Sequence, residues 1–198
     1  MKPVKIISDS TCDLSEDLKQ RYDVQIVPLY VTLGQESFTD GLTITPGDIY
    51  RYFEQTKQTP KTAAATVADF YAAFEPHAKE GRDIVFIGIS SKMSATVSQA
   101  ELAAKEFPGI RIRCIDSQSL SSGIGLSVLA ACDLAEQGLT ADEIASRIHA
   151  MVPRVRASFV IDTMTFLYYG GRCSAVKAYG ATLLKIKPQI SVTDGSMH

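Results

Sequence analysis

Short apolar runs rich in Val and Ile alternate along this chain with longer stretches in which apolar residues recur at helical spacing. A strand buried on both faces gives a near-continuous apolar run, whereas an amphipathic helix places apolar residues three or four positions apart. The runs predict strands at 4–8, 24–31, 83–90, 111–116 and 157–162, and the patterns between them predict helices at 15–21, 46–56, 67–80, 95–107, 123–137 and 141–151. This alternation is typical of an α/β fold, with a mostly parallel sheet and helices on both of its faces.

Three of the predicted helices begin with a capping-box pattern, in which a hydroxyl residue is followed three positions later by an acid. These starts are at Thr45, Thr66 and Thr140, and the first of them also has Pro at the next position. Gly138 is placed to end the helix before Thr140. The start signals therefore agree with the hydrophobic pattern.

The last quarter of the chain reads as the beginning of a second α/β domain. The strand–helix alternation changes around 150–156, which predicts a first domain at residues 1–152 and a second at 153–198. The segment PQISVTDG (188–195) predicts a strand that runs into an Asp-Gly hairpin turn. Only Ser-Met-His follow, so we expect the returning strand to be missing and the second domain to be truncated.

Composition narrows the class of partner. The chain has 198 residues, of which 45% are hydrophobic and 21% charged, and its formal net charge of −2 argues against a nucleic-acid partner. No apolar stretch reaches the roughly 18 residues that a membrane span needs. The N-terminus turns polar at Asp9, unlike a signal peptide. We therefore expect a cytoplasmic protein with no stable membrane insertion.

Neither a metal nor a cofactor is expected. The three His and four Cys are widely spaced and form no zinc-ligand pattern, so free thiols are the simpler interpretation. Gly123 and Gly125 follow a predicted strand, as in a dinucleotide-binding turn, but Val128 stands where the third glycine would be. The chain also has no phosphate-binding P-loop sequence and no GxSxG elbow.

Ser and Thr gather where predicted strands end, in the segments SDST (8–11), SSKMSAT (90–96) and DSQSLSSG (116–123). Parallel strands end at one edge of a sheet, where helix N-termini also point and where ligands bind. Neutral hydroxyls at that edge suit a small anionic group such as a carboxylate. The candidate residues are Ser10, Ser91, Ser94, Thr96 and Ser117. The alternative interpretation is that each hydroxyl only caps its own helix.

Two further segments carry open alternatives. In TPKTAAATVADF (59–70), the alanines at 63–65 offer either an apolar wall that a ligand can approach closely or the first turn of a helix. Arg172, directly after Gly170-Gly171, is either a structural charge near a helix end or a contact to a partner or its phosphate.

Taken together, these segments resemble the DegV family of bacterial fatty-acid-binding proteins. The resemblance runs in order over the whole chain. It is carried by SDSTCDL (8–14), IVPLYVTL (26–33), FTDGLTITPGDIY (38–50), TPKTAAATVADF (59–70), IGISSKMSATVSQA (87–100), CIDSQSLSSGIG (114–125), FVIDTMTFLYYGGRCS (159–174) and LLKIKPQISVTDG (183–195).

The resemblance implies a two-domain carrier, not an enzyme, with a long-chain fatty acid buried between the domains and presented to a partner fatty acid kinase for phospholipid synthesis. It places the carboxylate on Thr62 and Ser94. The chain departs from the family pattern next to both residues. Ala63 opens an alanine trio after Thr62, and Ala95 follows Ser94.

Two other functions stay open. One is an acyl or phosphoryl transferase with an edge serine such as Ser94 as nucleophile, although the sequence offers no obvious general base for it. The other is an interaction module whose apolar groove receives a protein segment.

Overall fold

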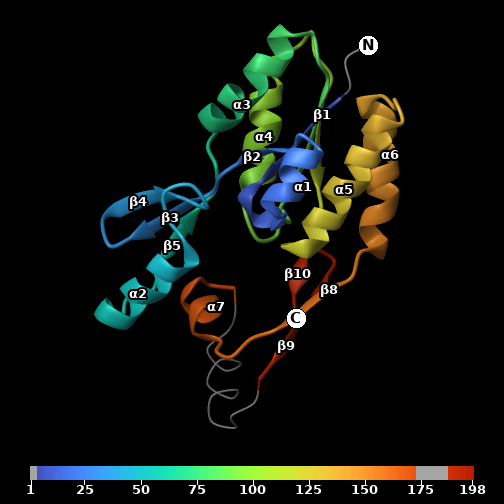
Figure 1. Cartoon of the computed structure of the whole chain (residues 1–198). Helices are drawn as coiled ribbons and strands as arrows, with labels where there is room; N and C mark the ends of the chain where they lie inside the picture. Colours follow the sequence, from blue (N-terminus) through green and yellow to red (C-terminus); the bar gives the residue numbers. More distant parts are fainter. Residues whose placement is uncertain (1–3, 173–186) are drawn as a thin grey trace.

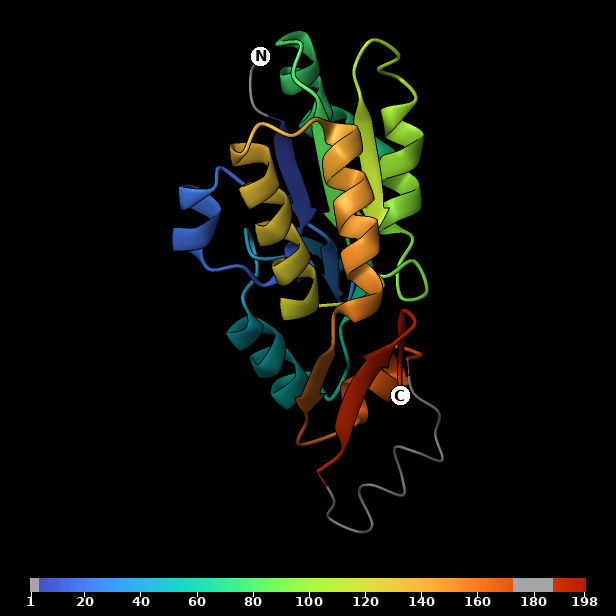
Figure 2. The ribbon, with the colours of Figure 1, turned by 90° about the vertical axis from the view of Figure 1, so that its right-hand side faces the viewer.

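The computed structural model describes residues 4–172 and 187–198, and its core is a parallel sheet with helices on both faces (Figures 1 and 2). The helices and strands, in chain order, are β1 (Lys5–Asp9), η1 (Ser10–Cys12), α1 (Glu16–Arg21), β2 (Gln25–Val27), β3 (Tyr30–Leu33), β4 (Glu36–Thr39), α2 (Pro46–Thr56), β5 (Lys61–Ala63), α3 (Val67–Lys79), β6 (Ile84–Gly88), α4 (Thr96–Ala104), β7 (Ile112–Asp116), α5 (Ser122–Glu136), α6 (Ala141–Met151), η2 (Val152–Arg154), β8 (Ala157–Val160), α7 (Thr165–Tyr169), β9 (Gln189–Thr193) and β10 (Ser196–Met197). The predicted α/β class is confirmed.

The central sheet has four parallel strands in the order β2-β1-β6-β7. Side chains alternate between its faces because a strand has a period of two. On β6, Ile84 and Phe86 join the cluster under α3 and α4, whereas Val85 and Ile87 join the cluster under α5 and α6. The two helix pairs lie on opposite faces of the sheet in Figure 1. Both faces are therefore covered, as the near-continuous apolar runs predict.

The helix starts follow the sequence signals closely. The hydroxyls of Thr45, Thr66 and Thr140 each accept a hydrogen bond from the backbone N–H three residues on, and in each case the acid at that position accepts one in return. Gly138 has a φ of 85°, the left-handed conformation that ends a helix. Local capping therefore fixes these boundaries.

The predicted strand at 24–31 is instead two strands, β2 and β3, separated at Pro28 and Leu29. β3 pairs antiparallel with β4 and β5, two strands that the hydrophobic pattern did not predict. All three residues of β5 are exposed, so no apolar pattern marks it. Of the alanine trio, Ala63 ends β5, while Ala64 and Ala65 lie between it and α3, outside a helix.

The expectation that the returning strand of the last hairpin is missing is wrong. Residues Ser196 and Met197 form β10 and pair with Thr193 and Val192. Asp194 and Gly195 both have positive φ, as a tight two-residue hairpin turn requires. Two residues are too few for an apolar pattern, so the strand is found only through its pairing with β9.

We call residues 157–172 and 187–198 the edge region, because they lie beyond the carboxyl ends of the parallel strands (Figure 2). It contains the antiparallel sheet β10-β9-β8 and the short helix α7. Among the described residues of this region, α7 is the only helix, and residues 173–186 lie outside the described part of the chain. The division into domains at 152 and 153 stays a prediction.

No helix within the described residues is both long and apolar enough to span a membrane.

Candidate binding site at the carboxyl edge of the sheet

Asp9 ties together the carboxyl ends of the two central strands. Its Oδ1 accepts a hydrogen bond from the N–H of Thr11 at 3.0 Å, and its Oδ2 accepts one from the N–H of Ile89 at 2.8 Å. Burial raises the pKa of this carboxyl, although the hydrogen bonds from Thr11 and Ile89 oppose the shift. Asp9 thus fixes the loops that carry the predicted hydroxyls.

The loop after β6 is folded on itself by its own hydroxyls. Ser91 donates a hydrogen bond to Oδ2 of Asp116 at the end of β7. Ser94 and Thr96 share a hydrogen bond of 2.8 Å between their hydroxyls, and Ser94 also accepts one from the N–H of Thr96 at 3.4 Å. The residue at the N-cap of α4 is Ala95, which makes no side-chain cap. These hydroxyls therefore do more than cap the helix.

The other two edge hydroxyls are occupied by neighbouring backbone. Ser10 accepts a hydrogen bond from the N–H of Leu29 at 3.1 Å. Ser117 is buried and bonds to both backbone groups of Ser119, which closes its own turn. In the present geometry both residues shape loops.

Thr62 and Ala63 lie on a separate element. They are on β5, where Thr62 stands opposite Val31 and Ala63 opposite Tyr30. Both residues are exposed, and the Thr62 hydroxyl has no hydrogen-bond partner among the described residues. The assignment of the carboxylate to Thr62 and Ser94 stays a prediction.

Arg172 links the edge region to the loop after β6. Its guanidinium donates one hydrogen bond to the carbonyl of Gly170, just past α7, and another to the carbonyl of Met93 at 3.0 Å. Of the predicted site residues, Arg172 is therefore brought next to Ser94, the residue that follows Met93.

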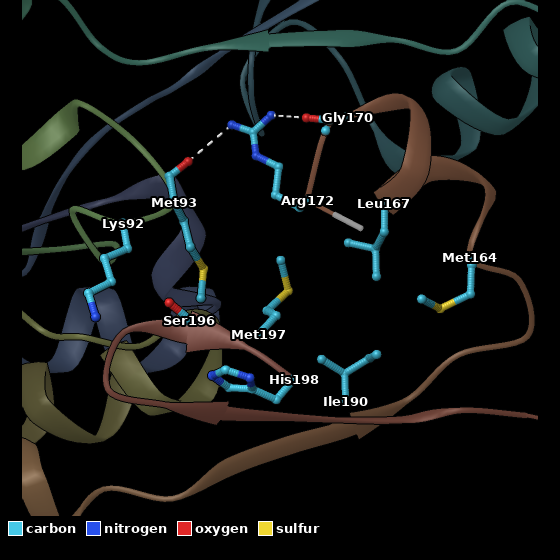
Figure 3. Close-up of a pocket in the computed structure, with 11 residues that line it drawn as sticks. Lys92, Met93, Met164, Leu167, Gly170, Arg172, Ile190, Ser196, Met197 and His198 are labelled. Atoms are coloured by element: carbon cyan, nitrogen blue, oxygen red, sulfur yellow. Dashed lines mark hydrogen bonds between the residues drawn. The ribbon is translucent and has the colours of Figure 1, made fainter. Parts of the chain in front are cut away.

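A cavity of about 720 Å³ lies between that loop and the edge region, and we call it the edge cavity (Figure 3). Its apolar wall comes from Met93, Met164, Leu167, Ile190 and Met197. Its polar groups include Lys92, Arg172, Ser196 and His198. Among the described residues, neither Thr62 nor Ser94 lines it.

The lining of the edge cavity went largely unpredicted. Lys92 and Met93 lie inside the hydroxyl-rich segment that the sequence singles out, but the predicted ligand contacts in that segment are its Ser and Thr residues. Met164 and Leu167 have the spacing of one helix face, which is a usable signal. Ser196, Met197 and His198 become wall residues only because β10 returns along β9.

A second cavity of about 610 Å³ includes Ser10 and Cys12 in its lining. Its lining also includes the carboxylates of Asp13, Glu16, Asp23 and Asp40. Glu16 and Asp23 already pair with Lys19 and Lys5. This acidic surface does not suit an anionic ligand.

The described residues contain no group of three His, Cys, Asp or Glu side chains placed to hold a metal ion. Cys12, Cys114 and Cys132 are free thiols, and Cys173 lies outside the described residues. Burial raises the pKa of both Cys114 and Cys132 to about 12. These two thiols are therefore protonated and poorly nucleophilic at neutral pH.

Comparison with known families decides the relationship. The model of the family described as "Uncharacterised protein, DegV family" matches residues 3–198. The chain belongs to the DegV family. A DegV domain-containing protein of Clostridium perfringens is 33% identical over 198 residues, covering 100% of this chain and 71% of the relative. One of Mycobacterium tuberculosis is 34% identical over 196 residues, covering 98% of this chain and 68% of that relative.

Solved structures of DegV proteins share the fold. A fatty-acid-binding DegV protein of Thermus thermophilus superposes with a TM-score of 0.89 at 34% identity, over 99% of this chain and 70% of the other. A stearic acid-binding protein of Eubacterium ventriosum gives a TM-score of 0.87 at 28% identity, over 98% of this chain and 68% of the other.

Proposed function

We propose that this DegV protein binds a long-chain fatty acid noncovalently and performs no chemistry on it. The observation that carries the proposal is the edge cavity, which combines an apolar wall of Met, Leu and Ile with the cations of Lys92 and Arg172. Small-molecule sites usually combine apolar walls with a few placed polar groups, and the edge cavity has both. Fatty-acid binding by similar DegV structures supports the same ligand class.

The tail and the carboxylate of a fatty acid contribute differently to its binding. Each methylene of the tail contributes about 0.8 kcal/mol when it is buried, so the apolar wall supplies most of the affinity. Hydroxyls at the head each contribute about 0.5–1.5 kcal/mol and mainly fix its orientation. We assign the carboxylate to Ser94, which directly follows the cavity residue Met93, and to Thr62. The head group then reaches beyond the lining of the edge cavity, which includes neither residue.

The first test is to extract the purified protein with organic solvent and identify the lipid by mass spectrometry. About one fatty acid per chain supports the proposal. An empty protein that also fails to bind palmitate when titrated with it contradicts the proposal, and an empty, tightly dimeric protein favours the interaction module.

The head-group assignment has its own test. Thr62→Ala and Ser94→Ala should reduce the preference for free palmitate over its methyl ester more than they reduce affinity for the ester. Ser98→Ala is the matched control, because that exposed hydroxyl bonds only to the carbonyl of Ala95. Equal losses for acid and ester would contradict the assignment.

The finer part of the proposal is that the bound fatty acid is presented to a partner fatty acid kinase in the cytoplasm, for phospholipid synthesis. Arg172 is exposed and its guanidinium is a rigid fork that suits a carboxylate or phosphate, so we assign it to the partner contact. Arg172→Ala should slow phosphorylation of bound palmitate by the kinase without weakening palmitate binding equally, whereas the exposed Arg154→Ala should do neither.

One contact favours a second candidate, an acyl or phosphoryl transferase. The Ser91 hydroxyl donates a hydrogen bond to the Asp116 carboxylate, which puts a base beside a potential nucleophile. Intact-mass spectrometry after incubation with an activated acyl donor tests it. A covalent adduct lost in Ser91→Ala would support this candidate over the carrier.

A further inference from the structure

Ser90 connects three segments that are far apart in the sequence. It is fully buried, two residues after the end of β6, and its hydroxyl donates a hydrogen bond of 2.7 Å to the carbonyl of Gly195 in the β9–β10 turn. Its backbone N–H donates to the carbonyl of Ser119, in the loop after β7, at 2.9 Å. The sequence marked Ser90 only as one member of a hydroxyl-rich loop.

The same residue also shapes its own loop. The hydroxyl of Ser90 accepts a hydrogen bond from the N–H of Lys92 at 3.3 Å. Its carbonyl accepts hydrogen bonds from the N–H of Met93 at 2.9 Å and of Ser94 at 3.1 Å. Ser90 therefore sets the path of the backbone that carries Lys92 and Met93 into the edge cavity.

The β9–β10 turn fits against Ser90 with no spare room. A Cβ placed on Gly195 would lie 2.6 Å from Oγ of Ser90, 3.6 Å from a side-chain carbon of Lys92 and 3.7 Å from Cα of Gln118. Gly195 also has a φ of +75°, which residues with a Cβ rarely adopt. Both the positive φ and the close approach to Ser90 favour glycine at this turn.

These contacts join the two walls of the edge cavity. Lys92 and Met93 enter from the loop after β6, while Ser196, Met197 and His198 enter from the strand directly after Gly195 (Figure 3). We propose that the Ser90–Gly195 contact is a clasp that positions the β10 wall of the edge cavity against the wall formed by the loop after β6. This inference rests on the proposed function, which makes that cavity the fatty-acid site.

Ser90 is thus a positioning residue that touches no ligand. Its removal leaves the carbonyl of Gly195 without its buried donor, so the hairpin moves away from the loop and Met197 packs less closely across from Met93. The tail then loses apolar contact on one side. This loss of contact with the tail differs from a general loss of stability, because it is confined to the β10 wall of the edge cavity.

The experiment compares Ser90→Ala with Ser127→Ala in the full chain. Ser127 is an equally buried serine, but its hydroxyl bonds only inside its own helix, to the carbonyl of Gly123. Palmitate affinity and amide hydrogen exchange are measured for both variants. Ser90→Ala should weaken palmitate binding by about five- to tenfold and speed exchange at Ser191 and His198, which bond to each other across the hairpin. Ser127→Ala should do neither.

Gly195→Ala tests the same contact from its other side, so it keeps the proposal falsifiable if Ser90→Ala folds poorly. Where both variants fold, they form a double-mutant cycle. Gly195→Ala should weaken binding by itself, and it should weaken it less in the Ser90→Ala background, because the Oγ that its Cβ would meet is then gone. Strictly additive effects, or unchanged hairpin exchange in Ser90→Ala, would overturn the clasp. If the wild-type chain binds no palmitate, the proposed function fails, and the exchange measurement alone decides whether the clasp holds the hairpin.

Discussion

The parallel-sheet region and the edge region of this protein differ in how many apolar side chains they bury. Around β2, β1, β6 and β7, two clusters of buried side chains fill both faces of the sheet. Among the described residues of the edge region, the corresponding cluster has only Met164 and Ile190 as buried members. Burial of apolar area dominates folding free energy, so the sheet region should supply most of the stability.

The difference has a functional consequence. Segments that bind ligands are drawn from the less stable parts of a fold, because they must open and close around the ligand. The thinly packed edge region supplies Met164, Leu167, Ile190 and Met197 to the edge cavity, while the densely packed region supplies only Lys92 and Met93. Stability and binding should therefore respond to different substitutions.

The largest expected effect is in the sheet core. Phe86 is fully buried and its ring lies 4.9 Å from that of Phe70, edge to face. Phe86→Ala should lower the free energy of unfolding by about 3–5 kcal/mol, measured by urea denaturation. Phe159→Ala, in the partly buried edge cluster, should cost only about 1–2 kcal/mol. Equal costs would contradict the contrast between the regions.

The next substitution, in the edge region, should affect palmitate binding more than stability. Met197→Gln keeps the size of a half-buried side chain in the edge cavity but makes it polar. It should change the free energy of unfolding by less than about 1 kcal/mol, yet weaken palmitate binding by about five- to tenfold. Leu126→Gln, on the exposed face of α5, is the matched control and should leave binding unchanged. A large unfolding effect without a binding effect would assign Met197 to the core.

Two matched helix-cap substitutions, Thr140→Ala and Thr45→Ala, should have smaller effects on stability. Thr140 caps α6, which buries four side chains against the sheet, whereas Thr45 caps α2, which buries none. Thr140→Ala should lower the free energy of global unfolding by about 1 kcal/mol. Thr45→Ala should instead speed amide exchange within α2 and leave the global value nearly unchanged. Equal global losses would show that α2 unfolds with the sheet.

The same contrast explains what could be predicted from the sequence. The helix predicted at 141–151 coincides with α6, because capping residues and an apolar face are local signals. β5 was missed because its three residues are exposed and owe their conformation to pairing with β3. Strands of that kind carry no pattern of their own.

The proposed site could be predicted only in outline. Strand ends rich in Ser and Thr pointed to the carboxyl edge of the sheet, next to which the edge cavity lies, since parallel strands end together. The partner of each hydroxyl could not be predicted, because Ser90 bonds to a carbonyl 105 positions away. The apolar wall likewise joins Met93 to Met164 and Met197, and no periodic pattern relates these positions.

The smallest expected effect concerns pH and is confined to the sheet region. His77 on α3 shares a 2.6 Å hydrogen bond with Oε1 of Gln25 on β2. Burial, with the nearby charges of Lys5 and Arg82, lowers the pKa of His77 below its ordinary value of 6.5. The unfolded state therefore binds a proton at a higher pH than the folded state, so stability is lost as the pH falls below 6.5 toward the folded pKa and regained as the pH rises.

His77→Gln keeps a donor for Gln25 but cannot titrate in this window. Between pH 7.0 and pH 5.5, the wild-type chain should lose more unfolding free energy than the variant, by about 0.5 kcal/mol or less because the ring is partly solvated. Urea denaturation at the two pH values measures the difference. Exchange at Ser191 and His198 in the hairpin should respond equally in both proteins, because His77 packs against β2 and not against the edge region. An equal pH dependence of unfolding would mean that His77 has the same pKa in the folded and unfolded states.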